Sequence, residues 1–178
     1  AAGSDRVVAT ILTNSGVERH LAANGIALER TAVGDRHIAE RLGGRAGGFG
    51  GEKSGHLLFT DLSPTGDGLI SAITVLGLVA RSRRTVSQLV REVPLDPQLQ
   101  ATVRVPLADG PRLMGEPALQ TAIEAAEATL ARTGGRVVVR LSGTEPLLRV
   151  MAEGPDLSEV AAAVDRLIEV AASLVRER

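Results

Sequence analysis

The sequence predicts two small units in series: an α/β unit over residues 1–95 and an α+β unit with an antiparallel sheet over residues 96–178. Three observations lead to this division. Apolar runs typical of strands alternate with segments of helical spacing in the first half, as in an α/β layer. Residues 93–100, VPLDPQLQ, then hold two prolines among polar neighbours, which indicates a hinge. Beyond the hinge, strand-like runs and long helical segments predict helices on one face of an antiparallel sheet.

In the first unit, β-branched and alternating apolar runs predict strands at residues 7–12, 26–33 and 57–60. Helical spacing predicts helices at residues 17–24, within 34–44, at 67–81 and at 86–93. Gly25 ends the first helix, Gly43 and Gly44 end the second, and Asp67 begins the third. Seven glycines between positions 43 and 55 predict an irregular loop, a kind of segment that often carries function.

In the second unit, the same criteria predict strands at residues 101–107, 137–140 and 147–152, and helices at residues 117–132 and 157–175. Pro155 helps to end the last strand, and Ser158 is a candidate cap for the final helix.

Composition excludes several classes of function. The formal net charge of −1 and the presence of only two aromatic residues, Phe49 and Phe59, argue against a nucleic-acid partner. The absence of cysteine excludes disulfides and thiolate metal sites. No apolar run is long enough to span a membrane, and the first residues do not resemble a secretion signal, so we expect a cytoplasmic protein with no membrane partner.

The first candidate site is the polar loop in VVVRLSGTEPLLRV, residues 137–150. The loop combines a planar guanidinium, two hydroxyls and a glycine that lets the backbone approach a ligand closely and adopt unusual conformations: Arg140, Ser142, Thr144 and Gly143. Such a set suits a phosphate. The alternative is a polar strand connection whose arginines are merely solvated.

Arg149 extends this candidate site if the loop folds back as a hairpin. Both guanidinium groups, of Arg140 and of Arg149, then reach one anion, which the arginine fork matches with two contacts at once. A carboxylate at Glu145 would repel a phosphate, so we expect it to face away, towards an arginine or a backbone donor.

The second candidate site is GGEKSGH, residues 50–56. If this segment is locally extended, Glu52, Ser54 and His56 lie on one side and offer donors and acceptors to sugar hydroxyls. The alternatives are a structural hydrogen-bonding role for His56 and a solvated loop charge for Glu52.

Other polar motifs indicate less. Asp35 in VGDRH either caps the helix that follows or binds a ligand, and the single carboxylate of Asp67 between glycines is too little for a metal site. The sequence contains no nucleophile elbow, no phosphate-binding P-loop and no carboxylate cluster. The residues thus indicate binding, and we assign none of them a catalytic role.

The motifs VGDRH, GGEKSGH, TGDG and RLSGTEPLLRV, in this order, resemble the C-terminal part of the α-D-phosphohexomutases, domains 3 and 4, in the form found in bacterial phosphoglucosamine mutases. The resemblance covers nearly the whole chain. It implies that residues 1–95 are domain 3 without its opening segment and that residues 96–178 are domain 4.

The same resemblance implies an activity, which is the interconversion of glucosamine 6-phosphate and glucosamine 1-phosphate on the route to UDP-N-acetylglucosamine and the cell wall. In this family a phosphoserine in domain 1 transfers the phosphoryl group, and a loop in domain 2 holds magnesium. Neither motif is present in this chain, so we expect the chain alone to be inactive and its partners to be domains 1 and 2.

Carried onto this sequence, the resemblance implies that Glu52 and Ser54 read the sugar hydroxyls and that His56 lies near the reacting centre. The Arg140 loop would grip the phosphate that is not transferred and let a sugar bisphosphate intermediate turn and rebind. Lys53 and Leu141 stand where the family usually has glutamine and proline, which bears on sugar selectivity and loop rigidity. The alternatives are part of a phosphoglucomutase or phosphomannomutase, or a non-catalytic module that binds phosphosugars.

Overall fold

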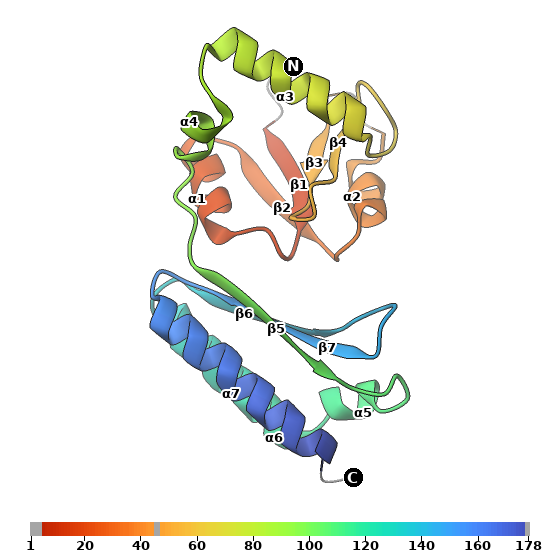
Figure 1. Ribbon diagram of the computed structural model, residues 1–178, viewed down its shortest axis with the longest axis vertical. Coiled ribbons are helices and arrows are strands. Elements are labelled where there is room, and N and C mark those ends of the chain that lie inside the picture. The colour runs from red at the N-terminus through yellow and green to blue at the C-terminus, as the bar shows by residue number, and fades with distance from the viewer. Residues whose placement is uncertain (1–4, 45–46, 177–178) are drawn as a thin grey trace. The chain divides into compact units, whose positions relative to one another are not determined.

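The computed structural model describes residues 5–44 and 47–176, which divide into two compact units, Ala1–Leu95 and Asp96–Arg178 (Figure 1). The first unit is built on a mostly parallel sheet and the second on an antiparallel sheet. This confirms the predicted fold class, α/β followed by α+β.

The sheet of the first unit has the strand order β2-β1-β3-β4. The central strand β1 (Arg6–Thr10) pairs in parallel with β2 (Ala27–Thr31) and with β3 (Phe49–Gly51). The edge strand β4 (Leu57–Phe59) runs antiparallel to β3. The helices are α1 (Ser15–Ala23), α2 (Asp35–Leu42), α3 (Gly68–Ser82) and α4 (Val86–Val90), and α1 and α2 flank the sheet on opposite sides (Figure 1).

The core of this unit is small and lies between α2 and the sheet. Its buried side chains are those of Val8, Ile38, Leu42 and Leu58. Gly50 permits this packing, because a Cβ atom there would lie 2.4 Å from Ile38 Cγ2 and 2.7 Å from the Val8 carbonyl oxygen.

The strand β3 lies inside the segment that we expected to be an irregular loop. Its sequence, Phe-Gly-Gly, carries no strand signal of its own, since glycine is depleted in strands. Pairing with β1 on one side and β4 on the other makes it a strand. Residues 45 and 46 of the expected loop lie outside the described residues.

Two of the predicted helix starts can be compared with the structure. Asp67 caps α3 as predicted, since its Oδ1 accepts hydrogen bonds from the amides of Leu69 and Ile70 at 2.8 and 2.9 Å. The capping role that we considered for Asp35 is wrong. Gly34, with φ of 127°, occupies the cap position of α2, and Asp35 is the first helical residue.

Helix α3 forms where its spacing predicts, but it is almost entirely uncovered. No residue of α3 is buried, and the exposed fractions of Leu69, Ile73 and Leu76 are 77%, 70% and 66%. The nearest strand, β4, has only three residues and offers little surface to cover a fifteen-residue helix. In the described chain, α3 therefore presents a stripe of large apolar side chains to solvent.

The second unit has a three-stranded antiparallel sheet in the order β5-β7-β6. Helices α6 and α7 pack along one face of this sheet (Figure 1). The strands are β5 (Gln98–Arg104), β6 (Arg136–Leu141) and β7 (Leu147–Glu153), and the helices are α5 (Gly110–Met114), α6 (Pro117–Ala131) and α7 (Leu157–Arg176). Alternate residues of β7 point to the helices, so Leu148, Val150 and Ala152 are buried against the helix residues Leu119, Leu130 and Leu167.

Buried polar contacts pin the register of this sheet. Glu153 at the end of β7 lies opposite Gln98 of β5 and Arg136 of β6. Its fully buried carboxylate accepts hydrogen bonds from Gln98 Nε2 at 2.6 Å and from Arg136 Nε at 2.7 Å. Since an unpaired buried charge is very unfavourable, these contacts disfavour a shifted register.

Three details of the second unit differ from the sequence prediction. Strand β5 begins at Gln98, inside the expected hinge, because Gln98 pairs with Glu153. The short helix α5 was not predicted. Asp156, and not Ser158, caps α7, since its Oδ1 accepts hydrogen bonds from the Ser158 hydroxyl and from the amides of Ser158 and Glu159. These bonds hold the pKa of the Asp156 carboxyl below its usual value.

Candidate functional site

The predicted phosphate loop is the connection of the β6–β7 hairpin. The Ser142 amide donates to the Leu147 carbonyl at 2.8 Å and closes the hairpin. Inside the loop, the Glu145 amide donates to Ser142 Oγ at 3.3 Å, and the Leu147 amide donates to the Glu145 carbonyl at 2.8 Å. Ser142 is buried, so its hydroxyl helps to hold the loop in shape.

The hairpin brings together the two arginines that the sequence singled out. Arg140 of β6 and Arg149 of β7 are direct partners in the antiparallel ladder, so their side chains leave the same face of the sheet. This is the face away from α6 and α7, because the neighbours Val139, Leu141, Leu148 and Val150 pack into the helical core. The loop therefore folds back as a hairpin with both guanidinium groups on one side, as the interpretation of Arg149 required.

The two arginines differ in their surroundings. Arg140 is half-buried, and its guanidinium donates from Nη1 to the Leu141 carbonyl at 3.3 Å. No carboxylate contacts it among the described residues. Burial, and then the charge of Arg149, lower the pKa of Arg140 from its ordinary value. Arginine nevertheless stays charged at any working pH, so the loop holds an incompletely compensated positive charge.

Glu145 points to Arg149. Its Oε2 accepts a hydrogen bond from Arg149 Nη2, in an ion pair whose side chains are 52% and 37% exposed. Of the two expected directions for Glu145, an arginine or a backbone donor, the structure thus has the arginine.

Gly143 and Thr144 form the exposed tip of the loop. Their backbone and hydroxyl groups have no side-chain hydrogen bond among the described residues. Gly143 does not use the conformations that are open only to glycine, because it is not among the glycines with positive φ, and an added Cβ would meet nothing within 4 Å. A glycine here leaves the backbone amide uncovered, which suits an anion, but the fold does not require it.

The predicted sugar loop is the tight connection between β3 and β4. The Glu52 amide donates to the His56 carbonyl at 3.0 Å, and the Gly55 amide donates to the Glu52 carbonyl at 2.9 Å. Gly55 adopts φ of 96°, which favours glycine. The segment is therefore a turn, and the locally extended conformation that we considered is wrong.

The turn gathers the three side chains around one imidazole nitrogen. His56 Nδ1 lies 2.9 Å from Ser54 Oγ and 3.2 Å from Glu52 Oε1. The Glu52 side chain is only 10% exposed, whereas that of His56 is 59% exposed. A carboxylate at Nδ1 favours a proton on that nitrogen and leaves Nε2 as the acceptor of the neutral ring. Nε2 has no protein partner in the described part of the chain, and the His56 side chain is largely exposed.

The two positions that depart from the family pattern have different surroundings. Lys53 is exposed in the predicted sugar loop, the turn between β3 and β4 that we call the sugar turn. Leu141, at the end of β6, packs against the apolar core of its unit and lies over Gly110, where an added Cβ would come within 2.9 Å of it. An apolar contact thus supports the start of the candidate phosphate loop.

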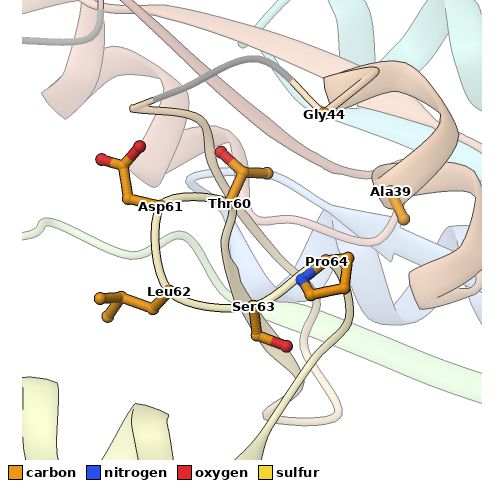
Figure 2. A pocket seen from close by; sticks show the side chains of 7 residues that line it. All are labelled: Ala39, Gly44, Thr60, Asp61, Leu62, Ser63 and Pro64. Carbon is orange, nitrogen blue, oxygen red and sulfur yellow. The ribbon is translucent and has the colours of Figure 1, made fainter.

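A hollow of about 370 Å3 lies between the end of α2 and the segment after β4. Figure 2 shows its lining, in which Thr60 and Asp61 point the same way and Leu62 points elsewhere. Asp61 accepts a hydrogen bond from the Gly47 amide, and Thr60 donates to the Gly48 carbonyl at 3.1 Å. These polar groups are occupied by the loop itself, and no predicted site residue lines the hollow.

Neither candidate loop fits a metal ion. In residues 5–44 and 47–176, no three histidine or acidic side chains are grouped in a way that would hold one. None of the helices in those ranges is long and apolar enough to cross a membrane.

Comparison with known proteins places the chain in a family. Residues 1–95 match the model of the phosphoglucomutase/phosphomannomutase α/β/α domain III, and residues 103–170 match the phosphoglucomutase/phosphomannomutase C-terminal domain. The chain is 48% identical over 165 residues to the phosphoglucosamine mutase of Novosphingobium aromaticivorans, covering 92% of this chain and 36% of that protein. It is 46% identical over 172 residues to that of Ruegeria pomeroyi, covering 96% and 37%. The chain thus spans little more than a third of these relatives.

Solved structures share the fold at lower identity. Aspergillus fumigatus N-acetylphosphoglucosamine mutase, in complex with GlcNAc-6P and magnesium, superimposes with a TM-score of 0.77 at 19% identity, over 96% of this chain and 39% of that one. A phosphomannomutase homologue from Thermus thermophilus gives a TM-score of 0.58 at 20% identity, over 96% and 36%. With both domain models matched in order along the chain, the protein belongs to the phosphoglucomutase/phosphomannomutase family of α-D-phosphohexomutases.

Proposed function

We propose that this chain supplies sugar and phosphate recognition to a phosphoglucosamine mutase that interconverts glucosamine 6-phosphate and glucosamine 1-phosphate. The reaction would take place in the cytoplasm, on the route to UDP-N-acetylglucosamine for the cell wall. The single observation that carries the phosphate part is the facing pair of Arg140 and Arg149 at the mouth of the β6–β7 hairpin. The choice of sugar rests on the identity to phosphoglucosamine mutases.

The phosphate loop would hold the phosphate that does not react. Arg140 and Arg149 approach from neighbouring strands, and the exposed tip at Gly143 and Thr144 adds a backbone amide and a hydroxyl. Charge-assisted contacts of this kind are short and directional, so they fix the position of the sugar relative to the reacting phosphate. A bisphosphate intermediate presents a phosphate at either end, so one loop serves both orientations.

The sugar turn would read the hydroxyl groups. The Glu52 carboxylate accepts hydrogen bonds from hydroxyls, and the Ser54 hydroxyl both donates and accepts. His56 Nε2, which has no protein partner among residues 5–44 and 47–176, would face the ligand while Glu52 and Ser54 orient the ring from Nδ1. Hydrogen bonds of this kind discriminate between sugars, because a missing or inverted hydroxyl leaves buried partners unpaired.

A phosphate titration of the 178-residue chain tests the phosphate part. Arg140→Ala should cost roughly 1.5–3 kcal/mol of phosphate binding, as expected for a hydrogen bond to a charged group. Arg132→Ala is the matched control, since it removes the same charge from an exposed position at the end of α6. Equal phosphate affinity in wild type and Arg140→Ala, measured by calorimetry or NMR titration, would refute the assignment.

The chemistry itself would depend on groups outside this chain. A phosphoserine would donate and recover the phosphoryl group, and magnesium would neutralise charge on it. Since neither of the two loops fits that role, we propose that the isolated chain does not turn over glucosamine 6-phosphate. Formation of glucosamine 1-phosphate by the purified chain, followed by phosphorus NMR with magnesium and glucose 1,6-bisphosphate added, would contradict this.

A further inference from the structure

The loop contains one acidic side chain whose role the proposed function does not explain. Glu145 lies within the loop, four residues before Arg149, and its backbone is held on both sides by hydrogen bonds to Ser142 Oγ and from the Leu147 amide. This geometry directs its carboxylate to the Arg149 guanidinium. The Glu145 carboxylate therefore forms an ion pair with one of the two arginines that we propose bind the phosphate.

We propose that Glu145 is a built-in competitor of the ligand: its carboxylate neutralises Arg149 while the loop is empty and is displaced when a phosphate dianion binds. The proposal rests on the proposed function of this loop in phosphate recognition. In addition, Glu145, a residue of the loop itself, lowers the affinity of the loop for phosphate.

The charges around the loop support displacement. In the empty loop, the guanidinium groups of Arg140 and Arg149 leave the same face of the sheet, and the Glu145 carboxylate pairs with Arg149. One positive charge therefore stays uncompensated. If a dianion bound and Glu145 stayed, negative charges would outnumber positive ones on this small surface. If Glu145 moves away, the dianion and the two arginines balance.

The exposure of the pair makes release easy. The Glu145 and Arg149 side chains are 52% and 37% exposed, so water screens their attraction and can solvate the carboxylate once it leaves. A buried pair such as Glu153 with Arg136, at 0% and 25% exposure, would not open in this way. On this face of the sheet, the Arg136–Glu153 pair would stay closed, and the Arg149–Glu145 pair would open when phosphate binds.

A weakened grip suits a ligand that must leave and return. A bisphosphate intermediate has to release this loop, turn and rebind, and a very tight phosphate site would slow its release. A competing carboxylate shifts the affinity downward without removing any of the contacts that position the phosphate.

The test is a titration of the 178-residue chain with inorganic phosphate at pH 8 and low salt. Glu145→Gln should lower the dissociation constant about two- to fivefold, the range expected for removing one exposed charge contact. Glu145→Ala, as a second variant, should act in the same direction. Glu169→Gln is the matched control, because Glu169 forms a local ion pair with Arg166 on α7 in which both side chains are exposed, so this change should leave phosphate affinity unchanged.

Two further readouts separate competition from a merely structural role. The gain from Glu145→Gln should shrink in an Arg149→Gln background, and it should fade in about 1 M salt, where exposed charges are screened within about 3 Å. An unchanged or raised dissociation constant in both Glu145 variants would overturn the inference while leaving the phosphate loop intact. If phosphate fails to bind the wild-type chain, or binds equally well to Arg140→Ala, the proposed function fails and the inference fails with it.

Discussion

Arg140 and Arg149 lie directly opposite each other on the neighbouring strands β6 and β7, so two positive charges share one face of a small sheet. Like charges in this position destabilise a sheet, whereas the Arg136–Glu153 pair at the other end of the same two strands joins opposite charges. The hairpin therefore has a favourable pair, Arg136 and Glu153, at its open end and an unfavourable pair, Arg140 and Arg149, next to the loop. An arrangement that weakens the fold at one place is expected where a ligand supplies the missing charge.

The first prediction concerns this conflict between stability and binding. Arg140→Gln should leave the free energy of unfolding unchanged or raise it by up to about 1 kcal/mol, because it removes a repulsion across the ladder. The lowered pKa of Arg140 has the same sign, since the fold disfavours the protonated form, and arginine is protonated throughout the working pH range. Phosphate affinity should fall. Urea unfolding without phosphate is the measurement.

Arg136→Gln provides the opposite control for that experiment. It removes a partner of the fully buried Glu153 carboxylate and should destabilise the unit by roughly 1–3 kcal/mol. Destabilisation by Arg140→Gln of similar size would mean that Arg140 is a structural residue.

The second prediction concerns the exposed tip of the phosphate loop. Gly143→Ala should change the free energy of unfolding by less than about 0.5 kcal/mol, because the added methyl group meets nothing within 4 Å and φ is not positive. It should weaken phosphate binding, since the methyl group crowds the uncovered amide. Gly50→Ala, by contrast, should clearly lower the free energy of unfolding, because its Cβ would overlap Ile38 and the Val8 carbonyl. A clear loss of stability in Gly143→Ala would show that the glycine serves the fold.

The third prediction concerns sugar selectivity in a complete phosphoglucosamine mutase carrying these residues. Glu52→Gln should change the ratio of kcat/KM for glucosamine and glucose phosphates, because we propose that this carboxylate reads the sugar hydroxyls and it lies 3.2 Å from His56 Nδ1. Arg140→Lys should weaken both substrates by similar factors, since every phosphohexose presents a phosphate.

Lys53→Gln sharpens the same measurement. An ammonium group at the exposed tip of the sugar turn would repel the charged 2-amino group of glucosamine, so its removal should favour glucosamine over glucose phosphate. The proposed division between the two loops is wrong if Arg140→Lys shifts the ratio more than the two changes in the sugar turn.

The fourth prediction concerns the uncovered helix α3. Leu76 is 66% exposed, so Leu76→Gln should change the free energy of unfolding by less than about 0.5 kcal/mol. It should also reduce self-association of the chain, measured by analytical ultracentrifugation, because it interrupts the apolar stripe. Leu58→Ala, at a position that is 1% exposed, should instead cost about 2–5 kcal/mol. Equal losses of stability in both variants would mean that α3 is covered in solution.

The sequence by itself determined the fold class and most elements, because apolar periodicity decides which face of a segment is buried and glycine, proline and cap residues decide where it ends. It identified the RLSGTEP and GGEKSGH segments because their polar residues are concentrated between apolar strands. It missed β3, whose Phe-Gly-Gly sequence becomes a strand only through its neighbours, and it misplaced the start of β5, which the pairing of Gln98 with Glu153 decides.

Only the tertiary structure decided how the candidate residues face one another. The hairpin register sets Arg140 against Arg149, and the turn at Gly55 brings Ser54 and Glu52 to the same nitrogen of His56, where an extended segment would have set them in a row. Sequence spacing shows only how far apart two residues are along the chain. Their distances and burial depend on strand register and turn geometry, and therefore on contacts between residues far apart in the sequence.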